Sequence, residues 1–71
     1  MNRAERLALA IAATIKDMGD NGAPSGIIFA GLQGQCTFSE YNSIINKLIE
    51  LKLIRRKFHV LYWIGDRQQE G

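Results

Sequence analysis

Hydrogen-bonding side chains recur at helical spacing in the segment TFSEYNSIINKLIE, residues 37–50. Asn42 and Asn46 are one helical turn apart, and an asparagine amide that donates and accepts together matches the N6/N7 edge of adenine. Ser39 and Ser43 can bond a phosphate or a base edge, and Lys47 can bond a phosphate. These residue types at this spacing favour a surface that reads double-stranded DNA.

A cluster of positive charge overlaps and follows this segment. Between residues 47 and 57 there are five cationic side chains against Glu50 alone, a local charge of +4. The net charge of +2 is too small to indicate a nucleic-acid partner, but phosphate attraction depends on the local field. Four residues are expected to hold the DNA backbone beside the groove, the histidine at lower pH: Arg55, Arg56, Lys57 and His59.

The same residues also fit an ordinary solvated surface. Asparagine, serine and lysine are common on any outer helix face, and charged residues protect an edge strand from aggregation. In a strand, alternation sends Arg56 to the opposite side from Arg55 and Lys57. Glu40 and Glu50 lie near the polar helix face and would repel phosphates, although the role of Glu40 in the helix cap partly explains its presence there. Both interpretations stay open.

The first element that must support this surface is an amphipathic helix predicted from about Arg3 to Met18. Asn2 can cap it, with Glu5 as the reciprocal partner of a capping box, and Gly19 can end it. Its expected core stripe is Ala4, Leu7, Ala8, Ile11, Ile15 and Met18. Ala12 and Ala13 leave part of the helix smooth, which suits a homodimer or a protein partner.

Two further helices are predicted. Pro24 and Ser25 open a short one that closes at Gly34, and Gln35-Cys36 forms an extended link. Thr37 caps the next, with Glu40 completing the box, and this helix ends softly near residues 50–52 because no glycine marks its end. Its expected apolar face is Phe38, Tyr41, Ile44, Ile45, Leu48, Ile49 and Leu51.

A β-hairpin follows, with strands predicted at residues 53–57 and 60–64. The expected register pairs Ile54 with Trp63 and Arg55 with Tyr62, and both aromatic residues are expected to pack rather than to stack on bases. Two-residue hairpin turns favour Asn-Gly, so Phe58-His59 predicts a looser turn of three or four residues.

Composition narrows the class of protein. The 71 residues predict one small domain, and Cys36 as the single cysteine predicts a buried thiol in a reduced, cytoplasmic protein. No apolar run approaches the roughly 20 residues of a membrane span. No nucleophile–base spacing is present, and the glycine pair at residues 31–34 lacks the lysine of a phosphate loop. We therefore expect no enzymatic activity, cofactor or metal.

The order helix, helix, short link, helix and hairpin resembles the winged helix-turn-helix family over residues 3–64. The segment LIELKLIRR, residues 48–56, is similar to its pattern L-x-x-x-x-L-I-x-R. Two features depart from the family: Lys52 stands where a glycine is often found, and the wing at residues 57–60 is short.

The resemblance implies an α+β fold over residues 1–65, with three helices followed by a short two-stranded antiparallel β-hairpin. Residues 66–71 contain no apolar side chain and are expected to form a disordered tail. The resemblance also implies DNA binding, with the third helix in the major groove and the hairpin on the backbone. A small transcription regulator or a mobile-element accessory protein would use such a domain. The alternative is a protein-interaction module that does not bind DNA.

Overall fold

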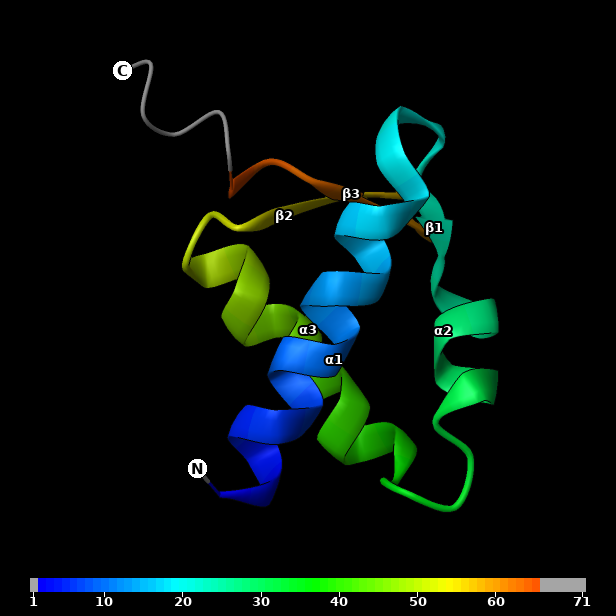
Figure 1. The fold of residues 1–71 in the computed structure, drawn as a ribbon, viewed down its shortest axis with the longest axis vertical. Helices are drawn as coiled ribbons and strands as arrows, with labels where there is room; N and C mark the ends of the chain where they lie inside the picture. The colour runs from blue at the N-terminus through cyan, green and yellow to red at the C-terminus, as the bar shows by residue number, and fades with distance from the viewer. Residues whose placement is uncertain (1, 66–71) are drawn as a thin grey trace.

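Three α-helices and a three-stranded antiparallel sheet make up residues 2–65, the part of the chain that the computed structural model describes. In chain order the elements are α1 (Arg3–Met18), the 3-10 turn η1 (Gly19–Asn21), β1 (Ala23–Pro24), α2 (Ser25–Gly31), α3 (Phe38–Glu50), β2 (Ile54–Lys57) and β3 (Val60–Trp63). In Figure 1, α1 and α3 cross in the centre, and the sheet lies across their upper ends. The α+β class is confirmed, whereas the tail predicted at 66–71 lies outside the described residues.

Helix α1 has the predicted bounds and the predicted cap. The Asn2 side chain accepts from the Glu5 amide at 2.8 Å, and the Asn2 amide donates to the Glu5 carboxylate at 3.3 Å. Its buried stripe is narrower than expected and consists of Leu7, Ile11 and Ile15. Met18 is 42% exposed, and Ala4 is also exposed. The smooth patch shrinks as well, because Ala12 packs against the core.

Strand β1 was not predicted, and it corrects the expected two-stranded sheet. It pairs with β3 through Ala23 opposite Leu61 and Pro24 opposite Val60, so that β3 is the central strand. Gly22 precedes it with φ +81°, and a Cβ there would lie 2.5 Å from the Val60 side chain. A two-residue edge strand that contains proline carries almost no sequence signal.

Helix α2 ends at Gly31, three residues before the predicted end at Gly34. Residues 32–36 turn back on themselves instead of forming an extended link, and Gly34 adopts φ +87° within them. Ser25 does not cap the helix: its hydroxyl lies 2.8 Å from the Tyr41 hydroxyl of α3. Cys36 packs against the core but is only half-buried, so the prediction of a buried thiol is confirmed in part.

Helix α3 begins at the predicted capping box, in which the Thr37 hydroxyl accepts from the Glu40 amide at 3.1 Å. Tyr41, Ile44, Ile45 and Leu48 are buried and join the core with α1 and the sheet. The ends of the predicted apolar face are exposed, since Phe38 is 60% exposed and Leu51 is 51% exposed. The buried part of the face is therefore its middle, although Phe38 still contacts the rings of Phe29 and Tyr41, at centroid distances of 5.4 Å and 6.4 Å.

The end of α3 is sharp, not soft. The Lys52 amide donates to the Ile49 carbonyl at 2.9 Å, and the Leu53 amide donates to the Leu48 carbonyl at 3.0 Å. Lys52 adopts φ +62°, the left-handed conformation that this pair of hydrogen bonds requires. A lysine therefore occupies a Schellman position where glycine is the usual residue, which is the place where the sequence departs from the family pattern.

The hairpin has the predicted register, with Ile54 opposite Trp63 and Arg55 opposite Tyr62. The strands are one residue shorter than predicted at their outer ends, Ile54–Lys57 and Val60–Trp63. The prediction of a looser turn is wrong, because Lys57 pairs directly with Val60 and leaves only Phe58 and His59 in the turn. A two-residue hairpin turn requires a positive φ at its first residue, and Phe58 adopts φ +57°.

Candidate nucleic-acid interface

The side of α3 opposite its buried residues carries uncharged hydrogen-bonding side chains and, in its last turn, the exposed carboxylate of Glu50. Ser39, Ser43 and Asn46 follow one another at intervals of four and three residues, and all three are exposed. Asn42 lies at the edge of this stripe and is half-buried, while Lys47 is exposed at the other edge. The exposed part of the predicted reading surface is therefore Ser39, Ser43, Asn46 and Lys47, with Asn42 only partly accessible.

Glu40 is engaged on both of its carboxylate oxygens. The Thr37 amide donates to Oε1 at 2.8 Å, and the Arg3 guanidinium donates to Oε2 at 2.9 Å. The hydrogen bond from the Thr37 backbone is the main cause that lowers the pKa of Glu40, and the charge of Arg3 adds to it. Because a cation sits directly on the carboxylate, its repulsion of a nearby phosphate is offset.

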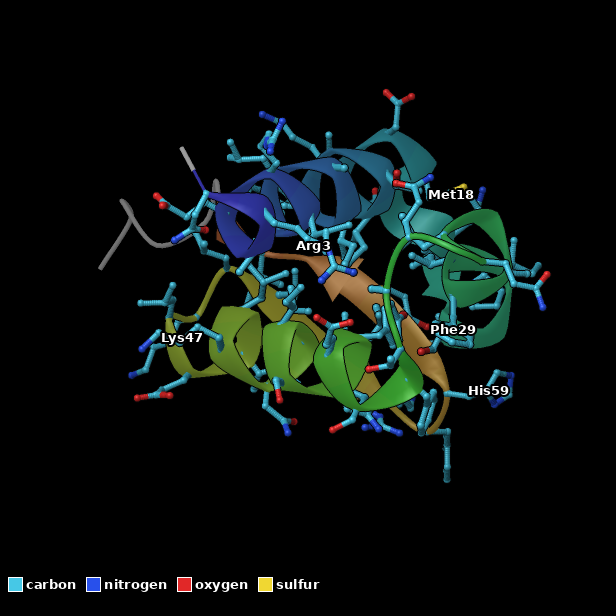
Figure 2. All side chains as sticks on the ribbon, turned by 90° about the horizontal axis from the view of Figure 1, so that it is seen from below. Arg3, Met18, Phe29, Lys47 and His59 are labelled. Atoms are coloured by element: carbon cyan, nitrogen blue, oxygen red, sulfur yellow. The ribbon has the colours of Figure 1, made fainter. Side chains whose placement is uncertain are left out.

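Arg3 was not among the predicted site residues. Besides the ion pair with Glu40, its guanidinium donates to the Gln35 carbonyl, so that it joins the start of α1 to the loop before α3. Figure 2 shows Arg3 reaching from α1 toward α3. The partners stand 37 residues apart in the chain, and no local pattern signals such a contact.

The cationic residues of β2 are divided between the two faces of the sheet. Residues directly paired in an antiparallel sheet share a face, and Arg56 is paired with the buried Leu61. Arg55 is paired with Tyr62 and therefore lies on the opposite face, together with Lys57. All three are exposed, but at most two of them share a face, as the alternation predicts.

Arg56 is on the face that packs toward α3. Burial raises the pKa of the Tyr41 hydroxyl, and the Ser25 hydroxyl and the positive charge of Arg56 oppose that rise. Arg56 also donates from Nε to the Phe58 carbonyl at 3.0 Å, which fixes its side chain along the turn. Among the strand cations, Arg56 is therefore the one directed toward the helix that carries the polar stripe.

The turn itself is tied to the helices. The Ser25 amide donates to the His59 carbonyl at 2.7 Å. Figure 2 shows His59 and Lys47 at opposite ends of the molecule, both on the side of α3 rather than of α1. Lys47, at the edge of the polar stripe, thus lies on the same side of the molecule as the turn.

Several hollows lie beside the described helices, and two of them bear on the candidate functions. An apolar one of about 160 Å³ lies between α1 and α2, where Ile27 and Met18 contribute side chains. A second, of about 420 Å³, lies between the first turns of α1 and α3, where Arg3 and Ser43 contribute. Within residues 2–65, no group of three His, Cys, Asp or Glu side chains could hold a metal ion. The same residues contain no helix that is long and apolar enough to cross a bilayer.

Comparison of the chain with protein-family models, with curated proteins and with solved structures finds no match in any of the three. The function is therefore inferred from the residues and geometry of the chain itself.

Proposed function

We propose that the chain is a winged-helix DNA-binding domain that inserts α3 into the major groove and places its basic hairpin on the neighbouring backbone. The order of helices and hairpin supports this class. Small transcription regulators and accessory proteins of mobile elements both use a domain of this kind, and we propose a role of that sort for this chain.

The observation that supports the proposal is an exposed stripe of hydrogen-bonding side chains on α3, with Lys47 at its edge on the same side of the molecule as the turn of the basic hairpin. Ser39, Ser43 and Asn46 offer donors and acceptors suited to base edges. Lys47 and Arg56 suit the phosphates on either side of the groove, because phosphate contacts set orientation while base contacts set sequence preference. The ion pair between Arg3 and Glu40 offsets the repulsion that Glu40 would exert on a phosphate, whereas the exposed carboxylate of Glu50 still opposes phosphate binding at the end of the stripe.

Salt dependence tests this proposal. The affinity of the full chain for a labelled random-sequence duplex would be measured by fluorescence anisotropy at ~50 mM and ~200 mM salt. With three phosphate contacts, a slope of about −0.9 per contact lowers affinity roughly 40-fold over this range. An absence of binding at the lower salt concentration would refute DNA binding.

Charge variants then locate the contacts. Arg56→Ala should weaken binding to every sequence and reduce the salt slope by about one. Arg55→Ala should weaken binding and reduce the salt slope only if the opposite face of the sheet also contacts the DNA backbone. Arg6→Ala removes the same charge from the exposed surface of α1 and is the matched control. Asn46→Ala should instead change the preference among sequences while leaving the salt slope unchanged.

A second candidate function is a protein-interaction module built on the same scaffold. It is favoured by the apolar hollow between α1 and α2, beside which Ile27 is 66% exposed. Retention of a protein partner that is insensitive to salt, together with no binding to duplex DNA, would support this function. Sedimentation at high concentration would test whether the partner is a second copy of the chain.

A further inference from the structure

Phe58 is the most exposed of the large apolar side chains in residues 2–65, at 84%. It stands first in a two-residue turn that favours asparagine or glycine, and it adopts φ +57°. Both features are unfavourable for the folded chain alone: the ring gains little from burial, and the left-handed backbone is strained for a bulky residue. Phe58 thus stands at a position where folding does not explain an aromatic residue.

The backbone beneath this ring is held firmly. Arg56 donates to the Phe58 carbonyl at 3.0 Å, and the Ser25 amide donates to the His59 carbonyl at 2.7 Å. The pair Lys57–Val60 closes the turn without any extra residue. The ring is therefore projected from a braced turn and not from a long loop, so that little backbone freedom would be lost when the ring is inserted into a partner.

The neighbours of Phe58 indicate the chemistry of that partner. Lys57 and His59 flank it in the chain, and Arg56 is bonded to its carbonyl. Phe58 makes no ring contact with another aromatic residue in the described part of the chain, and a protein-docking surface would present a contiguous apolar patch instead. A single apolar ring next to the cationic side chains of Arg56 and Lys57 matches duplex DNA, in which charged phosphates border apolar base stacks.

We propose that Phe58 is a wedge that enters the minor groove of bound duplex DNA and partly unstacks one base step. The inference rests on the proposed function and adds to it the mode of contact and a bend in the DNA. Apolar side chains inserted in this way kink the duplex, and pyrimidine–purine steps such as TA yield most easily. The hairpin would therefore favour deformable steps without reading base edges.

The test uses duplexes that carry the adenine analogue 2-aminopurine, whose fluorescence rises when it is unstacked. One probe per duplex would be moved stepwise through a site containing TA steps, at saturating protein and ~50 mM salt. The key variant is Phe58→Asn, because asparagine tolerates the left-handed turn and changes no charge. Leu9→Gln, on α1, removes another exposed apolar side chain and is the control. Circular dichroism would establish that both variants are folded.

If Phe58 acts as a wedge, the wild-type chain and Leu9→Gln will raise the 2-aminopurine fluorescence at one or more probe positions, whereas Phe58→Asn will not. Phe58→Asn should also bind roughly 5-fold more weakly, or weaker still, with an unchanged salt slope. Salt-dependent binding with no fluorescence rise at any position, or with the same rise for Phe58→Asn, would overturn the wedge and leave the DNA-binding proposal intact. No binding by the wild-type chain would overturn both.

Discussion

Replacing Lys52 by glycine should stabilise the protein. Lys52 holds the left-handed position of the Schellman turn that ends α3, with φ +62°. Its amide is satisfied by the Ile49 carbonyl at 2.9 Å, and glycine would keep that hydrogen bond. The substitution therefore relieves a steric conflict between Cβ and the following carbonyl and breaks no backbone contact.

The size of the gain follows from two opposing terms. A left-handed residue with a side chain is disfavoured by about 1–2 kcal/mol, and glycine loses about 0.5–1 kcal/mol more than alanine through backbone entropy on folding. The difference leaves a net stabilisation of about 0.5–1 kcal/mol. For a domain of this size, such a change raises the unfolding midpoint by roughly 2–8 °C.

Thermal unfolding followed by circular dichroism, together with urea titration, measures this gain. Lys52→Ala is the matched control because it removes the same charge but keeps the Cβ that causes the strain. Its stability should stay within about 0.5 kcal/mol of the wild type. Equal stabilities for Lys52→Gly and Lys52→Ala would refute the conformational argument and assign any effect to the charge.

Three further predictions concern single contacts. Burial raises the pKa of Tyr41, so its stabilising contribution is complete below the ordinary tyrosine range and is lost as the pH rises through the raised value. Tyr41→Phe should remove that alkaline loss, and at neutral pH it should cost about 1 kcal/mol in urea titration for the missing bond to Ser25. Arg3→Met should lower the unfolding midpoint at neutral pH, and the deficit should shrink in acid as Glu40, whose pKa is lowered, becomes protonated. Gly22→Ala should lower the unfolding midpoint markedly, since its Cβ would lie 2.5 Å from a hairpin side chain and φ is +81°.

The starts of α1 and α3 and the register of the hairpin could be predicted because each depends on residues close together in the sequence. Both capping boxes join residues three apart, and the pairing of Ile54 with Trp63 follows from alternation around a fixed turn centre. The exposed members of the candidate site followed from the helical period of α3, which separates Ser39, Ser43 and Asn46 from the buried side. In each case the physical cause acts over one helical turn or one strand pair.

The contacts that join these elements could not be predicted in the same way. The pairing of β1 with β3 and the bond from Arg3 to Glu40 both link distant parts of the chain. The tight turn was missed for a different reason: the preference for Asn-Gly describes what is least strained, and a folded protein can hold Phe58 in a strained turn when neighbouring bonds stabilise it. At a strained position such as Phe58, the conformational preference of the turn does not by itself determine which residue the sequence contains.

Ser25 shows how such contacts bear on function. Its amide bonds the hairpin turn at His59 and its hydroxyl bonds Tyr41 in α3, so one residue at the start of α2 links the two surfaces proposed to meet DNA. A groove-reading helix and a backbone-holding hairpin are useful together only if their relative position is fixed before binding, because ordering them afterwards would lower affinity. In the proposed mode of binding, the predicted site residues would contact the DNA, and the two hydrogen bonds of Ser25, which no local pattern revealed, would fix the position of α3 relative to the hairpin.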